Sequence, residues 1–349
     1  MVTVRTRICI GSAAVALLCV VAAGCGGGEE SSQPAEKPSG GEKVVRVGLV
    51  TDSNQLNDHG FNQLAYQGMK RAQRVLGVKG IVYQSRSRSE YIPNLAALAR
   101  QHYDLVIGVG FDQAEAVDTV ATRYPRTHFA IVDVDQTSLA HRPDNVVGLL
   151  FREQEVGYLV GYLAGLEAKR MPGADVIGSV GGQKQPPVDR FIAGYQAGAK
   201  KANPQVKLLN DYSQDWVDQT KCKTLALNQI EAGSTIEFQV AGGCGLGTLR
   251  AAGERHVWGI GVDADQSFIG PQVLTSAVKR VDEAVFRTIK AVKNGTFAGG
   301  RNDVFGLDDD GVGLGKVSPR VPKTEVAQVQ KIKRQIVAGK VKIPTKVPG

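Results

Sequence analysis

Short apolar runs alternate with amphipathic helical patterns along the chain from Val44 onward. The apolar runs are rich in valine and isoleucine, and they predict strands at residues 45–50, 105–109, 129–132, 176–180, 206–209, 238–241 and 257–262. Helical periodicity between them predicts helices at 62–76, 113–123, 157–169, 187–201 and 219–232. Strands that are apolar on both faces and separated by helices are typical of parallel sheets. The runs fall into two groups on either side of residue 150, so we expect an α/β protein with two lobes.

Carboxylates, glycines and aromatic residues follow directly after the predicted strands. In open α/β sheets, ligands bind beyond the carboxyl ends of the strands. Carboxylates accept hydrogen bonds from hydroxyl and amine groups and repel phosphate, so this edge favours a neutral, hydroxyl-rich molecule. A single aspartate after a strand can equally be a helix cap or a turn former, but the pattern recurs in both groups. The sequence IVDVDQ at 131–136 also resembles GVDADQ at 261–266, as expected if the two lobes share one plan.

The first 24 residues have the pattern of a secretory signal. Arg5 and Arg7 precede an apolar stretch from Ile8 to Ala23, and small residues lie directly before Cys25. This cysteine occupies the position at which bacterial lipoproteins carry their lipid, so we expect the mature protein to begin at a lipidated Cys25. A plain secretory signal and an uncut anchor are the alternatives, although the apolar stretch is shorter than the ~20 residues of a spanning helix.

Residues 25–43 contain no aromatic residue and no apolar run, which is typical of a flexible tether or of an ordinary disordered N-terminus. Two cysteines lie in the predicted signal and Cys25 would carry lipid, so Cys222 and Cys244 remain. In an oxidising compartment, one disulfide between them is expected. Two buried free thiols are the alternative.

Charge and motifs exclude several classes of function. The formal net charge is +8, but the lysines and arginines look scattered and form no basic stripe with interleaved aromatics, so we expect no nucleic-acid partner. The five histidines form no metal-binding spacing, and the glycine-rich segment 243–247 matches no nucleotide-binding motif. We therefore expect no metal, no cofactor and no enzyme activity. A nucleoside hydrolase is the leading enzyme alternative, although its usual cluster of aspartates near one strand end is missing.

Several segments resemble one known family. VGLVTD at 47–52 followed by NDHGFN at 57–62 resembles the opening motif of the basic membrane protein (BMP) family, whose members are substrate-binding lipoproteins of ABC importers. The resemblance continues in order through 108–111, 129–133, 157–162, 178–182, 191–195, 241–243, 261–263 and 274–282. It spans nearly all of residues 44–300.

The resemblance implies a type I periplasmic-binding-protein fold, in which two α/β lobes enclose the ligand. Residues 44–150 and 278–305 would form the N-terminal lobe, and residues 151–277 and 306–349 the C-terminal lobe. It also implies a monomer on the extracytoplasmic face of a bacterial membrane, bound to the lipid bilayer through Cys25 and serving an ABC permease.

Family members characterised for ligand mostly bind purine nucleosides, so the resemblance implies a nucleoside site. Phe61 and Trp216 would stack on the base, and Gly243 would allow a close approach. The polar residues expected to contact the base are Asp52, Ser53, Asn62 and Asp112. Asp263 and Lys279 match the pair that binds the ribose hydroxyls. A sugar or signalling-molecule receptor on the same fold is the alternative among binding proteins.

Overall fold

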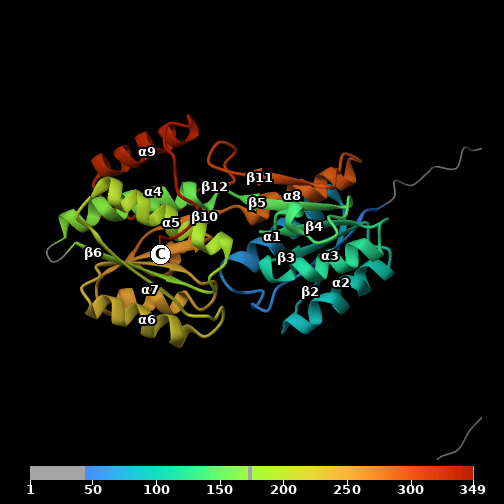
Figure 1. Ribbon diagram of the computed structural model, residues 1–349, viewed down its shortest axis with the longest axis horizontal. Helices are drawn as coiled ribbons and strands as arrows, with labels where there is room; N and C mark the ends of the chain where they lie inside the picture. Colours follow the sequence, from blue (N-terminus) through green and yellow to red (C-terminus); the bar gives the residue numbers. More distant parts are fainter. Residues whose placement is uncertain (1–43, 172–174, 349) are drawn as a thin grey trace, which may run out of the picture. The chain divides into compact units, whose positions relative to one another are not determined.

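The structure is a computed structural model that describes residues 44–171 and 175–348 (Figure 1). The predicted signal peptide at 1–24, the lipidation site Cys25 and the tether at 25–43 lie outside the described residues. The first sheet has the strand order β11-β5-β4-β3-β1-β2, and all its strand pairs are parallel. Its strands are β1 (Arg46–Val50), β2 (Lys79–Tyr83), β3 (Leu105–Val109), β4 (His128–Val132), β5 (Val146–Phe151) and β11 (Arg301–Phe305).

The second sheet repeats this plan in the order β12-β10-β9-β8-β6-β7. Its strands are β6 (Val176–Gly181), β7 (Lys207–Tyr212), β8 (Ile236–Val240), β9 (Trp258–Asp263), β10 (Val273–Lys279) and β12 (Val312–Leu314). The prediction of two sheets flanked by helices is confirmed, with one correction: β12 pairs antiparallel with β10. This three-residue strand forms at the sheet edge where the chain returns from β11, and an edge is where mixed sheets commonly carry such a strand.

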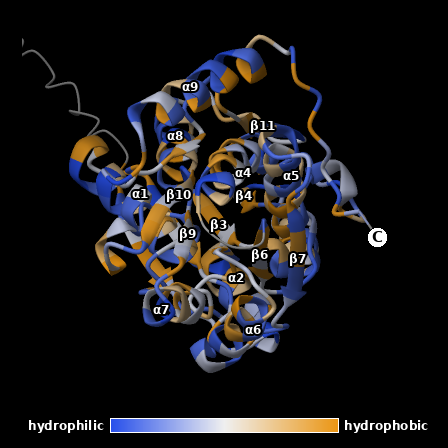
Figure 2. Cartoon of the chain, turned by 90° about the vertical axis from the view of Figure 1, so that its left-hand side faces the viewer, coloured by the Kyte–Doolittle hydropathy of each residue, from blue (hydrophilic) through white to orange (hydrophobic). Residues whose placement is uncertain are grey.

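Helices cover both faces of each sheet. In the first lobe, neighbouring residues of β3 alternate between the faces: Leu105 and Ile107 belong to the same apolar cluster as α1 and α8, whereas Val106 packs in the cluster of α2 and α3. In the second lobe, α4 packs on α5 and α6 on α7. The helices are α1 (Phe61–Leu76), α2 (Tyr91–Arg100), α3 (Ala114–Arg123), α4 (Glu153–Arg170), α5 (Pro186–Ala202), α6 (Gln219–Glu231), α7 (Leu246–Glu254), α8 (Val281–Lys293) and α9 (Lys323–Val337). Figure 2 shows apolar strands inside and helices with both polar and apolar stripes outside.

Glycines bring α4 and α5 into close contact. A Cβ atom added at Gly157 or Gly161 would overlap the α5 backbone at Phe191 and Tyr195, so only glycine permits this spacing. The two helices lie side by side in Figure 1. Their close packing matters for the site below, because Glu153 begins α4 and Phe191 lies on α5.

The chain passes between the two sheets after β5, after β10 and after β11. The predicted boundary at 277 is two residues early, because β10 continues to Lys279 in the second sheet. Lys279 therefore belongs to the C-terminal lobe and not, as predicted, to the N-terminal one. Among residues 44–171 and 175–348, none of the helices has the length and apolar character needed to span a bilayer.

Cys222 and Cys244 form a disulfide in the second lobe, and their Cα atoms lie 5.6 Å apart. Of the two sequence interpretations, the structure has the disulfide and not the pair of free thiols. Cys222 lies in the first turn of α6, and Cys244 lies in the loop between β8 and α7. The bond therefore joins the start of α6 to the loop that precedes α7.

Candidate functional site

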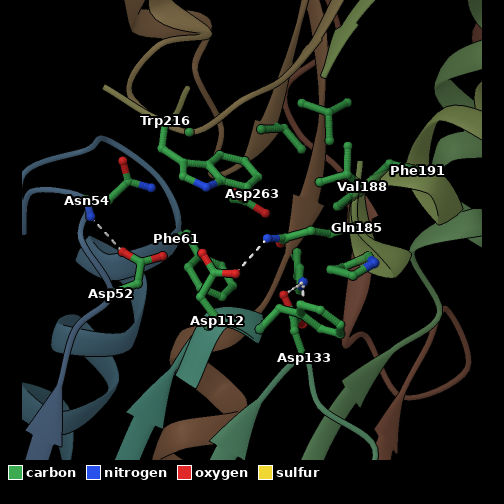
Figure 3. Close-up of a pocket in the computed structure, with 17 residues that line it drawn as sticks. Asp52, Asn54, Phe61, Asp112, Asp133, Gln185, Val188, Phe191, Trp216 and Asp263 are labelled. Carbon is green, nitrogen blue, oxygen red and sulfur yellow. Dashed lines mark hydrogen bonds and ion pairs between the residues drawn. The ribbon is translucent and has the colours of Figure 1, made fainter. Parts of the chain in front are cut away.

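A cavity lies at the carboxyl ends of the strands and is lined by both lobes (Figure 3). The first lobe contributes Asp52, Asn54, Phe61, Gly110, Phe111, Asp112 and Asp133. The second contributes Gln185, Pro187, Val188, Phe191, Trp216, Val240, Gly242, Val262, Asp263 and Lys279. The predicted residues Asp52, Phe61, Asp112, Trp216, Asp263 and Lys279 are among them.

The other three predicted residues lie beside the cavity and not in its lining. The Ser53 backbone N–H donates to the Tyr91 hydroxyl at 3.1 Å, away from the cavity. Asn62 is fully buried behind Asp52. Gly243 is not in the lining, whereas its neighbour Gly242 is. Gly242 has a φ of 54°, and a Cβ atom added there would lie 3.1 Å from Asn54 Nδ2.

Two aromatic side chains enter the cavity from different lobes. Phe61 is the first residue of α1, and Trp216 lies in the loop between β7 and α6 (Figure 3). The Trp216 ring packs so closely on Gly182 that a Cβ atom there would overlap it. The Trp216 carbonyl also accepts a hydrogen bond of 2.8 Å from the Cys244 backbone N–H. The Cys244 backbone thus holds the Trp216 backbone, and Gly182 leaves the space that the indole occupies.

Lys279 forms the centre of a buried charged cluster at the base of the cavity. Its ammonium donates to both oxygens of Asp133 at 2.6 and 2.7 Å and to Glu153 Oε1 at 3.0 Å. Arg190 Nε donates to the other oxygen of Glu153 at 2.6 Å. Burial acts to lower the pKa of Lys279, but the carboxylates of Asp133, Glu153 and Asp263 outweigh it and raise that pKa. Lys279 is therefore charged, and its direct partners are Asp133 and Glu153.

Aromatic rings surround the same ammonium. The Lys279 Nζ atom lies 4.8 Å from the ring centroid of Phe151, 5.2 Å from that of Phe61 and 5.9 Å from that of Phe191. Such cation–π contacts favour the charged form and hold the side chain in place.

Asp263 ends β9 with its carboxylate open toward the cavity. It forms no hydrogen bond or ion pair with any other residue that the structure describes, although it is only 7% exposed. Burial raises its pKa to about 7, against the opposing effect of Lys279. A buried carboxylate without a partner is costly, so this group is suited to accept hydrogen bonds from a ligand.

A second polar group faces the cavity from the loop after β1. Asp52 accepts hydrogen bonds from Asn62 Nδ2 at 2.7 Å and from the Asn54 backbone N–H at 2.9 Å. Burial raises the pKa of Asp52 to about 7 despite these bonds. Asn54 lines the cavity, and its side-chain oxygen is buried without a hydrogen-bond partner. Its position two residues after Asp52, at a strand end, was the signal that could have identified it.

Asp112 links the two lobes. One of its oxygens forms an ion pair of 2.9 Å with Arg88, and the other accepts a hydrogen bond of 2.9 Å from Gln185 of the second lobe (Figure 3). Arg88 also donates to Gln183 of the second lobe at 3.3 Å. The Arg88 side chain is 65% exposed, whereas that of Asp112 is 13% exposed. The four side chains thus form a polar bridge between the lobes.

The described residues contain no group of three or more histidines, cysteines, aspartates or glutamates placed to hold a metal ion. The cavity instead combines flat aromatic surfaces, carboxylates and one buried ammonium. This combination suits a molecule that has an apolar face together with hydroxyl or amine groups.

Comparison with known proteins identifies the family. Residues 45–346 match the Bmp family model, described as ABC transporter substrate-binding protein PnrA-like. The chain belongs to this family. A relative from Listeria innocua named CD4+ T-cell-stimulating antigen is 35% identical over 95% of this chain and 98% of its own length. The ABC transporter nucleoside-binding protein BmpA of Lactococcus lactis is 32% identical over 97% of this chain and 99% of its own length.

Solved structures of ABC transporter solute-binding proteins share the fold. The crystal structure of an ABC transporter solute-binding protein from Aeropyrum pernix has a TM-score of 0.79 and 29% identity, covering 87% of this chain and 94% of its own. A solute-binding protein from Conexibacter woesei has a TM-score of 0.70 and 28% identity, covering 86% of this chain and 99% of its own. The predicted family and the periplasmic-binding-protein-like fold are therefore confirmed, and the chain is an ABC transporter substrate-binding protein.

Proposed function

We propose that this Bmp-family protein binds purine nucleosides and delivers them to an ABC permease as a monomer, while lipid on Cys25 holds it at the extracytoplasmic face of the membrane. The observation that carries the ligand assignment is the placement of Phe61 and Trp216 in one cavity, one from each lobe. A purine is flat and apolar on its faces. Stacking of a base on an aromatic side chain stabilises binding by ~1–3 kcal/mol, and every base offers such a face.

The polar residues support a nucleoside over a free base. Asp263 offers a buried carboxylate with no other partner, and a ribose diol can donate two hydrogen bonds to it. The charged Lys279 lies close enough to Asp263 to influence its pKa, and its ammonium is held beside the site by Asp133 and Glu153. Asp52 and Asn54 provide further hydrogen-bonding groups for the base edge.

The same residues disfavour phosphate. Asp52, Asp112, Asp133 and Asp263 all line the cavity, and the one cationic lining residue, Lys279, is already bonded to Asp133. A nucleotide would bring like charge into a space of low dielectric constant, where repulsion is strong.

Names of relatives agree with this proposal. One relative is a nucleoside-binding protein, and a relative from Pyrococcus horikoshii that is 35% identical over 85% of this chain is named as a lipoprotein. The sequence pattern around Cys25 supports the same anchoring here.

Calorimetry with a panel of ligands tests the nucleoside assignment. We expect a purine nucleoside to bind most tightly, the deoxynucleoside more weakly because the Asp263 carboxylate is then desolvated without a hydroxyl partner, and the monophosphate not at all. Asp263→Ala is expected to lose most of the nucleoside affinity. Equal affinity for nucleoside and monophosphate, or an unaffected Asp263→Ala variant, would reopen the sugar-receptor interpretation. Incubation with inosine distinguishes a hydrolase, which would release the free base.

Cell fractionation tests the anchor. Cys25→Ser is expected to release the protein from the membrane fraction or to stall its processing. If the variant fractionates and migrates like wild type, the lipid anchor is wrong, whereas the ligand assignment is unaffected.

A further inference from the structure

The net positive charge of the folded protein is concentrated at the C-terminal end. Residues 44–310 contain twenty-nine lysines and arginines and twenty-nine aspartates and glutamates, so this part is neutral overall. Residues 311–348 contain nine lysines and arginines and a single acid, Glu325. Contrary to the prediction, the basic residues are therefore not scattered evenly along the chain. Like charges gathered in one segment repel each other, and an even distribution would avoid that repulsion.

Packing turns these side chains outward. Helix α9 places Val329, Ile332 and Ile336 in the core, where the helix packs on α4 (Figure 1). In the segment after α9, Val341 and Ile343 pack against the same core. Eight of the nine basic residues are exposed, and none of the eight forms an ion pair with a described residue; they are Lys316, Arg320, Lys323, Lys331, Arg334, Lys340, Lys342 and Lys346. We call these eight residues the basic surface.

The composition of the basic surface indicates the kind of partner. Six of its eight residues are lysines, which are mobile point charges, whereas bidentate recognition of a fixed anionic group favours arginine. Residues 311–348 contain no phenylalanine, tyrosine or tryptophan. The segment thus supplies none of the stacking residues of nucleic-acid sites and none of the aromatic anchors of specific protein interfaces. Mobile lysines without aromatic anchors are suited to a partner that presents a diffuse array of anionic groups.

We propose that the basic surface binds the anionic phospholipid headgroups of the membrane. The proposal rests on the proposed anchoring at Cys25, which would keep the folded unit within reach of the bilayer. Lipid attachment combined with a basic patch is a common way to hold a protein at a membrane. None of the cavity-lining residues lies in 311–348, so contact with lipid leaves the nucleoside site free.

Vesicle sedimentation tests the proposal with the chain from residue 26 onward, which lacks Cys25 and contains the whole described unit. The vesicles are phosphatidylcholine alone or phosphatidylcholine with phosphatidylglycerol, at low and high salt. We expect binding to the anionic vesicles only, weakening as salt rises. The variant Lys340→Gln/Lys342→Gln/Lys346→Gln is expected to bind roughly tenfold or more weakly, since each lysine near an anionic surface contributes separately.

A matched control removes the same charge elsewhere. Lys79→Gln/Lys201→Gln/Lys207→Gln changes three exposed lysines outside the basic surface and should keep the binding of wild type. Equal loss in both triple variants, equal binding to both vesicles, or tighter binding to duplex DNA than to anionic vesicles would overturn the proposal. Because the assay uses neither lipidation nor nucleoside, its failure leaves the proposed function standing, and calorimetry on the same variants checks that their cavity is intact.

Discussion

The two lobes place an aspartate at the same point, but they use it differently. Asp133 follows β4 and Asp263 ends β9, the third strand in each sheet order. Both have left-handed backbone angles, with φ of 70° and 63°, which few residues other than glycine adopt and which cluster at functional sites. The two similar sequences IVDVDQ and GVDADQ thus have the same backbone conformation at this aspartate. Asp133 binds Lys279, whereas Asp263 has no partner among the described residues.

This difference separates a structural role from a binding role. The first lobe neutralises a buried ammonium that comes from the second lobe, and this ion pair joins the lobes at the base of the cavity. The second lobe keeps an equivalent carboxylate open at the cost of desolvating it. The site therefore has one fixed acid and one available acid in the same geometry, and substitutions of the two should have different consequences.

The largest expected effect is on stability. Asp133→Asn removes one of the two carboxylates bonded to buried Lys279 and should lower the free energy of unfolding by up to ~3–5 kcal/mol, the range for broken buried ion pairs. Asp263→Asn removes a carboxylate that has no such partner, so it should lower the free energy of unfolding far less at neutral pH. Urea denaturation of both variants without ligand measures the difference. Equal losses would mean that Lys279 does not distinguish the two aspartates.

The pH dependence sharpens the same comparison. The pKa of Asp263 is raised from 3.8 to about 7 by burial, so its ionisation opposes folding. The stability that the protein has while Asp263 is protonated is fully present below pH 3.8 and is lost as the pH rises through about 7. Asp263→Asn lacks this loss, so its stability relative to wild type should increase between pH 5 and pH 8, as followed by urea denaturation at a series of pH values.

Asp135 provides a control of opposite sign. Burial acts to raise its pKa, but hydrogen bonds from Asn302 and Thr137 outweigh burial and lower it. The stability that ionised Asp135 contributes is present above the pKa that Asp135 has in the unfolded chain. This stability is lost as the pH falls through the lower pKa that Asp135 has in the folded protein. Asp135→Asn should therefore differ from wild type at neutral pH and converge with it in acid. A parallel pH profile for both variants would contradict the assignment of Asp263.

Much of the fold was predictable because its central strands are long runs of buried apolar residues. The strand β2, with the sequence KGIVY, was missed because it is a half-exposed edge strand without a continuous apolar run. The antiparallel strand β12 has only three residues. Helix α9 was missed because it buries only a narrow apolar stripe under a basic surface.

The site was predictable only in part, for a different reason. Phe61, Trp216 and Asp263 follow strand ends or family motifs, and the structure brings them to one cavity. Phe191 was not identified, because an apolar residue on α5 looks like any core residue. The bond between Lys279 and Asp133 joins positions 146 residues apart, and no local sequence pattern predicts such a pairing.

A smaller effect tests the aromatic pair across the lobes. Gly182→Ala would place a methyl group inside the Trp216 ring and should displace the indole from the cavity. Loss of one stacking face should weaken nucleoside binding by ~1–3 kcal/mol, measured by calorimetry. Gly313→Ala is the control, since an added Cβ there meets no atom within 4 Å. Unchanged affinity in Gly182→Ala would show that Trp216 does not contact the base.

The smallest expected effect concerns the bridge between the lobes on the side of Asp112. Arg88 holds Asp112 of its own lobe and Gln183 of the other, so Arg88→Ala should let the two lobes separate more readily and speed ligand release. The exposed ion pair is worth at most ~1 kcal/mol, so dissociation should be only about two- to fivefold faster in stopped-flow fluorescence. Arg86→Ala removes a nearby exposed charge whose side chain has no partner among the described residues, and it should release ligand at the wild-type rate.

The two variants also separate two roles of Asp112. If Asp112 mainly contacts the base, freeing it from Arg88 should strengthen binding, whereas if it mainly joins the lobes, Arg88→Ala should weaken binding through faster release alone.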